Sequence, residues 1–171
     1  MEALRGDYSQ DYHAGGNERS EILGMSVNQQ ILSSCANSEQ KLVDVVGYFE
    51  NCEESSLECV LCAMEFIFEK SKFYIVVQED DSFVLYPNDW CGDPKWKSIS
   101  FMKRRPWSLA IGSPLLWSWV LHNQQGYFDG IQLEFAKSTE SRSIIVQLVA
   151  LGSEIKQRDI AEKCSAITFT Q

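Results

Sequence analysis

The sequence lacks every motif that would name a reaction. Its glycines are scattered, and neither a GxxxxGK nor a GxGxxG phosphate loop occurs. No apolar run approaches the roughly 18 residues of a membrane helix, and no basic segment precedes a short apolar stretch as in a signal peptide. Histidine is scarce, with two in 171 residues. We therefore expect a cytoplasmic protein that uses no cofactor and no metal. A non-enzymatic role is favoured, and an enzyme is kept as the alternative.

Basic residues are fewer than acidic ones. The chain holds 15 Lys and Arg against 24 Asp and Glu, a net charge of −9. Residues 1–81 have 16 acidic and 5 basic residues, whereas residues 82–171 have 8 and 10. This balance argues against binding to free nucleic acid, which needs a basic surface. It favours a basic protein as the partner, or else it only keeps the protein soluble.

One segment of this acidic chain is rich in basic residues. Aromatic residues are interleaved with its five cations, as on a small nucleic-acid surface. The cations are Lys95, Lys97, Lys103, Arg104 and Arg105. Because the chain as a whole is acidic, the favoured interpretation is that they pair with the acidic half of the same molecule.

Apolar residues are plentiful. Hydrophobic residues make up 44% of the chain and aromatic residues 12%, which is enough for the core of one domain. Residues 1–19 are polar and aperiodic and predict a mobile N-terminal tail. Residues 20–171 predict a single α+β domain. A helix should open it, with Ser20 as N-cap, an apolar face of Leu23, Val27 and Ile31, and an end at 33–37.

From Lys41 onward the apolar period changes to that of strands. Short turns separate four segments, which predicts an antiparallel meander. The expected strands are residues 42–50, 57–69, 72–78 and 83–86. Residues 87–106 hold three of the four prolines and have no periodicity, so we expect an irregular loop there, with a short strand or helical turn near 99–102. Long loops of this kind are often functional.

The stretch 105–135 holds three of the five Trp and is expected to be the central hairpin of the sheet. Ser113 and Pro114 could open a helix, but the alternation that follows favours a strand. A turn at 123–126 and a return strand at 131–135 complete the hairpin. A buried strand at 144–151 is expected after it. Beyond Gly152 the pattern is ambiguous, and it is compatible with a short helix at 153–164 and a fraying strand at 166–170.

Together these elements predict an α+β fold. It should be a mostly antiparallel, curved sheet of six or seven strands with the N-terminal helix packed on it. Its aromatic-rich edges are compatible with a homodimer.

The six cysteines, at positions 35, 52, 59, 62, 91 and 164, are expected to be free thiols, with Cys59, Cys62 and Cys164 packed among apolar neighbours. Cys59 and Cys62 have the spacing of a metal-ligand pair. In a strand, however, positions i and i+3 point to opposite faces, so core packing is favoured unless a helical turn interrupts the strand.

The acidic turn at 79–81 and the irregular loop after it form the expected partner-binding surface. Its residues are Glu79, Asp80, Asp81, Asp89, Trp90, Asp93 and Trp96. The alternative is that these carboxylates only face water. The function expected from this surface is a non-enzymatic protein-binding domain, an immunity-type or regulatory inhibitor of a basic protein.

A small-molecule-binding protein or an enzyme is the competing hypothesis. Its cleft would use a pair of aromatic residues and the only His of the expected domain. Its residues would be Trp117, Trp119, His122, Asn123, Tyr127 and Asp129. Plain core packing of the Trp pair and a hydrogen-bonded structural His are the simpler alternatives.

Part of this stretch resembles a known group of proteins. Its residues are Pro106-Trp107, Ile111-Gly112, Trp119, Asn123-Gln124-Gln125-Gly126-Tyr127 and Asp129-Gly130. They resemble the signature of a small group of bacterial proteins of unknown function, over about the last two-thirds of the chain from near the first strand. The resemblance brings no catalytic residues, and small acidic proteins of this kind are similar to immunity proteins by class alone.

Overall fold

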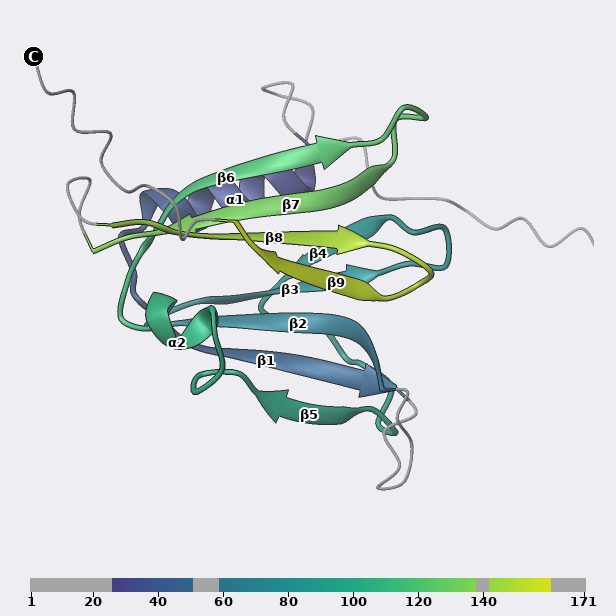
Figure 1. Ribbon diagram of the computed structural model, residues 1–171, viewed down its shortest axis with the longest axis horizontal. Helices are drawn as coiled ribbons and strands as arrows, with labels where there is room; N and C mark the ends of the chain where they lie inside the picture. The colour runs from purple at the N-terminus through teal and green to yellow at the C-terminus, as the bar shows by residue number, and fades with distance from the viewer. Residues whose placement is uncertain (1–25, 51–58, 138–141, 161–171) are drawn as a thin grey trace, which may run out of the picture.

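The protein folds into two antiparallel sheets and two helices over the residues that the computed structural model describes, 26–50, 59–137 and 142–160 (Figure 1). The first sheet has the order β4-β3-β2-β1-β5. Its strands are β1 (Leu42–Glu50), β2 (Val60–Phe68), β3 (Lys72–Val77), β4 (Phe83–Pro87) and β5 (Lys97–Ser100). The second sheet has the order β6-β7-β8-β9. Its strands are β6 (Leu115–His122), β7 (Phe128–Phe135), β8 (Ile144–Ala150) and β9 (Ile155–Asp159). The helices are α1 (Val27–Asn37) and α2 (Trp107–Ala110).

The two sheets face each other across one core, which follows from the alternation of side chains along the strands. In β7, Ile131, Leu133 and Phe135 are fully buried. Trp107 of α2 is fully buried at one end of the core, where its ring meets Phe66 of β2 and Phe135 of β7 edge to face. One side chain thus contacts both sheets.

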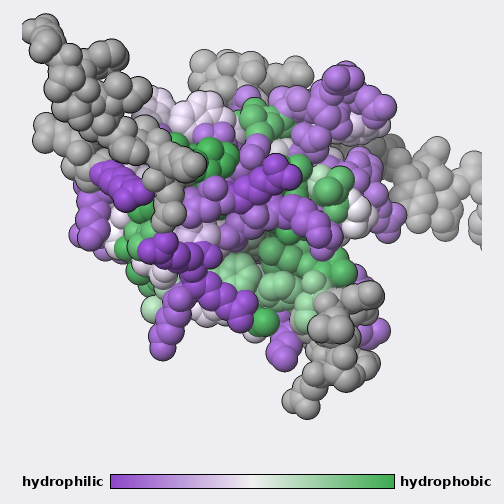
Figure 2. Space-filling model, in the orientation of Figure 1, coloured by the Kyte–Doolittle hydropathy of each residue, from purple (hydrophilic) through white to green (hydrophobic). Residues whose placement is uncertain are grey.

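The five-stranded sheet extends beyond the four-stranded one on the side of β1 and β5. Figure 2 shows apolar surface over β1 and β2, next to a hydrophilic band along β8 and β9. Phe49 and Ile99 are half-buried here, and Phe101 folds over Gly47. A methyl group on Gly47 would lie 2.6 Å from the Phe101 ring, so this close approach requires glycine.

Helix α1 closes one side of the sandwich, between the edge strands β4 and β6. Leu32 and Cys35 are its buried residues. Its N-terminus is a capping box, in which the Ser26 hydroxyl accepts from Gln29 N–H and the Gln29 side chain accepts from Ser26 N–H. The helix therefore starts at a defined residue.

Replacing Ser26 by alanine should lower the free energy of unfolding by about 1 kcal/mol, because the Gln29 N–H group in the first turn loses the hydroxyl that accepts from it. Urea denaturation measures the change. The matched control is Ser34→Ala, an exposed position within the same helix. An equal loss in both variants would contradict a specific role for the cap.

The structure confirms the α+β class, the antiparallel pairing and the packing of the N-terminal helix. The expectation of one sheet of six or seven strands is wrong, because the chain leaves the first sheet after β5 and starts a second sheet at β6. The 105–135 hairpin is present as β6 and β7, but β6 is an edge strand rather than central. The helical turn of that region lies at α2 instead of at Ser113.

Two further expectations are corrected. The helix begins at Val27 because Ser26 is extended (φ −64°, ψ 158°). Its buried residues are Leu32 and Cys35, and Ile31 packs against the core as expected, whereas Val27 is exposed. The segment at 153–164 contains strand β9, because residues with positive φ at Gly152 and Ser153 turn the chain back along β8. Residues 1–19, Ser20, Leu23 and 166–170 lie outside the described residues.

Candidate functional site

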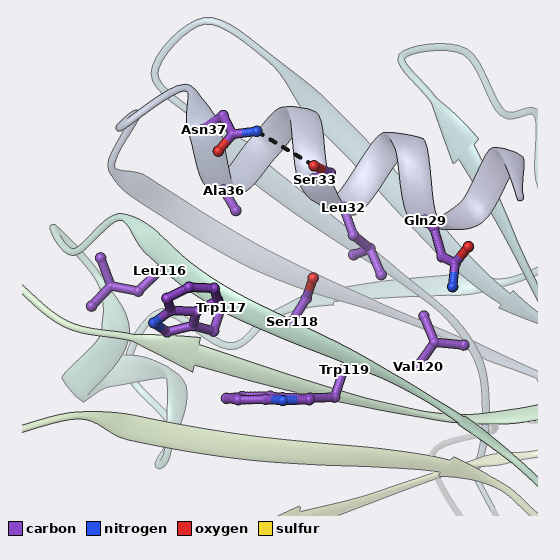
Figure 3. A pocket seen from close by; sticks show the side chains of 10 residues that line it. All are labelled: Gln29, Leu32, Ser33, Ala36, Asn37, Leu116, Trp117, Ser118, Trp119 and Val120. Atoms are coloured by element: carbon purple, nitrogen blue, oxygen red, sulfur yellow. Dashed lines mark hydrogen bonds between the residues drawn. The ribbon is translucent and has the colours of Figure 1, made fainter. Parts of the chain in front are cut away.

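A groove lies between α1 and the edge strand β6 (Figure 3), with a volume of about 580 Å³. Ten residues line it, and none of them is ionisable. They are Gln29, Leu32, Ser33, Ala36 and Asn37 of α1 and Leu116, Trp117, Ser118, Trp119 and Val120 of β6. Five consecutive strand residues can line one groove only if it runs along the edge of the strand, since their side chains alternate between the two faces.

The two indoles of this groove are exposed. Trp117 is 63% exposed and Trp119 is 42% exposed, whereas Ser118 and Val120 between and after them are half-buried on the side of α1. Figure 3 shows Ser118 directed towards the helix and Trp119 directed away from it, over the sheet. The strand period predicted for 115–121 is thus confirmed, but it presents the Trp pair to solvent rather than to the core.

The remaining residues of the expected small-molecule cleft lie apart from this groove, in the β6–β7 turn and at the strand ends that flank it. The Asn123 side chain accepts from the N–H groups of Gln125 and Tyr127 at 2.9 and 3.1 Å and so shapes the turn. His122 is exposed, and its Nδ1 lies 3.3 Å from the Gly126 carbonyl oxygen. Asp129 is half-buried in β7. The structure therefore brings Trp117 and Trp119 together and places the polar members of that set in and beside a hairpin turn.

A buried carboxylate marks a second constellation, on the outer face of the five-stranded sheet. Glu65 is 7% exposed. Its carboxylate accepts from the hydroxyls of Tyr48 and Tyr74 at 2.7 and 2.8 Å and from Lys72 Nζ at 3.1 Å. Lys72 Nζ also lies 2.6 Å from the Tyr74 hydroxyl oxygen. Both carboxylate oxygens of Glu65 accept hydrogen bonds from within the protein, so the network stabilises the fold without a ligand.

The electrostatics of this network agree with its geometry. Burial of Glu65 raises the pKa of its carboxyl group, but the hydrogen bonds from Tyr48, Tyr74 and Lys72 outweigh burial and the pKa is lowered overall. Burial and the nearby carboxylate raise the pKa of Tyr48. The network therefore contains a charged Glu65 and neutral tyrosines at neutral pH.

Trp90 covers this network. The loop between β4 and β5 joins opposite edges of the sheet, and it crosses the outer face with the Trp90 ring 5.5 Å from Tyr48, 5.4 Å from Tyr74 and 5.6 Å from Trp96. Gly92 lies against the Trp90 ring, where a Cβ would come within 2.7 Å. Both Trp residues are thus used in packing.

The expected partner-binding surface is divided between two places. Glu79, Asp80 and Asp81 form the β3–β4 turn at one end of that hairpin. The segment with Asp89 and Asp93 starts at the opposite end of β4. The length of β4, four steps from Phe83 to Pro87, separates the two places by roughly 13 Å. Asp81 is also engaged within the protein, since its carboxylate accepts from the Ser153 N–H of the β8–β9 turn at 2.6 Å.

The cysteines differ in part from expectation. Cys35 and Cys62 are free and buried, and Cys91 is free and exposed. Cys59, expected to be a buried free thiol, is exposed at the start of β2 and is disulfide-bonded. Burial raises the pKa of Cys35 to about 11, so this group is a protonated thiol at neutral pH. In the described part of the chain, no group of three or more His, Cys, Asp or Glu side chains could hold a metal ion. Cys52 and Cys164 lie outside it.

A family model, that of a family of unknown function (DUF6334), matches residues 26–163. The chain belongs to this family. The match starts at the N-cap of α1 and covers both sheets, so it includes the groove and the Glu65 network, and it begins earlier than the resemblance seen near the first strand. No curated protein and no solved structure matches the chain. No helix among the described residues is long and apolar enough to cross a membrane.

Sequence reasoning missed the Glu65 network and the role of α1 in the groove. One signal for the first was present, because Glu65 is the only ionisable carboxylate within the apolar strand VLCAMEFIF and faces a strand that carries Tyr74. No signal in the sequence places α1 beside β6, since more than 75 residues separate them.

Proposed function

We propose that this protein is a non-enzymatic protein-binding domain whose partner docks on β6, at Trp117 and Trp119. The exposed indole pair beside the groove carries this proposal. Trp is enriched where proteins bind each other, because it offers a large rigid apolar area at a small entropic cost. The fold does not require the pair, since the core is closed without it.

An immunity-type inhibitor of a basic protein, in a bacterial cytoplasm, is a narrower form of the same proposal. Its support is the acidity of the whole chain and the class resemblance alone. The described residues hold 14 acidic and 12 basic side chains, so most of the excess negative charge lies in the remaining segments. The charge of the described residues therefore gives little support to a basic partner, whereas the exposed indole pair supports protein binding directly.

Replacing Trp117 and Trp119 together by alanine should remove partner binding, because truncation of two central aromatic residues usually costs a factor of a hundred or more in affinity. Tagged wild-type and variant proteins would each capture the partner from native lysate, and the affinity for the purified partner would then be measured by calorimetry. The matched control is Tyr127→Ala, which removes an exposed aromatic residue of the neighbouring turn.

Unchanged affinity in the Trp117→Ala/Trp119→Ala variant would contradict the proposal. Binding that is lost equally in Tyr127→Ala would move the surface from the groove to the β6–β7 turn. Capture of no protein, with a small molecule raising the melting temperature of the wild type, would favour the small-molecule site instead.

A further inference from the structure

The two edge strands that flank α1, β4 and β6, differ in whether the backbone groups on their outer edge are hydrogen-bonded. Edge strands present unpaired N–H and C=O groups, which proteins usually cover. On the β4 edge, the Asn28 side chain of α1 accepts from Leu85 N–H at 3.1 Å and donates to the Phe83 carbonyl at 3.5 Å. Asn28 thus satisfies the backbone of β4 in the way that a neighbouring strand would.

The hydrogen-bond pattern identifies the corresponding groups of β6. Residue pairs in an antiparallel ladder alternate between bonded and non-bonded. Ile160 N–H donates to the Ile145 carbonyl at 3.0 Å, so Ile145 directs its backbone groups to β9. Glu134, opposite Ile145, therefore directs its groups to β6, where its partner is Trp117.

The backbone N–H and C=O groups of the next residue on β6, Ser118, therefore point away from β7. Because Trp117 and Trp119 bond to β7, the N–H and C=O groups of Ser118 and Val120 are directed to the free edge, into the groove beside α1. Among the described residues, neither a side chain nor another strand bonds to these four groups. Unlike β4, β6 is left open.

We propose that an extended, uncharged segment of the partner protein adds to β6 as a further strand, in the groove between β6 and α1. The inference rests on the proposed function and specifies its binding mode. Main-chain hydrogen bonds to Ser118 and Val120 would supply affinity, as in other cases of strand addition. The occupant is uncharged within the groove because none of the ten lining residues is ionisable, and a charge there would be desolvated without a partner.

The shape of the groove sets the length and pattern of this segment. Five residues of β6 line it, so a segment of about five residues fits at roughly 3.3 Å per residue. Its alternate side chains should be apolar where they face Leu32 and Ala36 of α1, and they pass beside Trp117 and Trp119 on the other face. A second copy of this chain fits the groove less well than a single strand, because its whole sheet would have to approach the β6 edge, and α1 lies beside that edge.

The decisive variant is Ser118→Pro. Proline removes the N–H group of Ser118 that points into the groove and leaves the bonds from β6 to β7 intact, and edge strands tolerate proline at such positions. The control is Ser118→Ala, which keeps the N–H group and removes only the hydroxyl. A displayed library of random ten-residue peptides serves as the probe, together with the purified partner once it is known.

We expect binders with uncharged, alternating apolar residues, whose affinity falls about tenfold or more with Ser118→Pro and less than about twofold with Ser118→Ala. Amide hydrogen exchange of the wild type gives an independent result. The N–H groups of Ser118 and Val120 should exchange fast in the free protein and slowly with peptide bound, while those of Trp117 and Trp119 stay protected in both.

Several outcomes would overturn the inference. Unchanged exchange at Ser118 and Val120 on binding, or a library that yields no binder at the groove, excludes strand addition. Protection that rises with protein concentration alone would identify a second copy as the occupant. If Trp117→Ala/Trp119→Ala abolishes partner binding and Ser118→Pro does not, the protein-binding function stands and only this mode fails.

Discussion

Replacing Trp107 by alanine is expected to lower the free energy of unfolding by about 3–5 kcal/mol. The side chain is fully buried and lies against Phe66 of one sheet and Phe135 of the other, so truncation leaves a cavity between the two sheets. Its Nε1 also donates to the Gln157 side chain at 2.6 Å, and that amide would lose its partner. Equilibrium urea denaturation at neutral pH measures the change.

The chain contains a matched control for this substitution. Trp117→Ala removes the same side chain from a position that is 63% exposed, and it should change stability by less than about 1 kcal/mol. Trp107→Phe should fall between the two, since it keeps an aromatic ring in the core and loses the hydrogen bond to Gln157. Equal losses for Trp107→Ala and Trp117→Ala would contradict the role of Trp107 as the contact between the sheets.

The second large effect is expected at Glu65. Glu65→Ala leaves the Tyr48 hydroxyl without its acceptor and removes the carboxylate that pairs with Lys72. We therefore expect the free energy of unfolding to fall by about 2–3 kcal/mol at neutral pH. Lys72 is partly exposed, which reduces the ionic share of this effect. Urea denaturation and the fluorescence of Trp90, which packs on both tyrosines, report the change.

The same carboxylate predicts a pH dependence. The pKa of Glu65 in the folded protein is lower than its ordinary value, so its stabilising contribution is complete above that ordinary value and is lost as the pH falls through the folded pKa. The wild type should lose stability over this acidic range, and Glu65→Gln should lack that part of the loss. Glu79→Gln, in the exposed β3–β4 turn, is the control and should behave as the wild type. Parallel acid curves for the wild type and Glu65→Gln would contradict the prediction.

Elements with a strong local pattern are predictable from the sequence, and elements that depend on distant segments are not. The meander of β1 to β4 was predicted to within three residues at each end, because alternation of apolar side chains and short polar turns are local properties. The segment of β9 has no such alternation: Ile155 is its only buried residue. It becomes a strand because β8 offers a free edge, and local periodicity does not record that.

The candidate site shows the same division. The Trp pair was identified from the sequence as one strand face, but the question of whether that face meets the core or solvent depends on the second sheet. The expected partner surface combined acidic residues close in sequence, and the β3–β4 hairpin separates Asp80 and Asp81 at its turn from Asp89, which follows its other end. Nothing in the sequence singles out Asn28, because its partners in β4 lie 55 and 57 residues away. Among the described residues, β6 has no equivalent side chain on its edge.

The sequence by itself determined the α+β class, most strands, the direction in which they pair and the absence of a motif for catalysis. Those features depend on side-chain period, turn residues and composition, which act over a few residues. Only the tertiary structure decided that there are two sheets, that Glu65 is buried among tyrosines, and that α1 borders an open edge of β6. Each of these depends on which elements pack together, and packing is set by the sum of many weak contacts between distant segments rather than by any one of them.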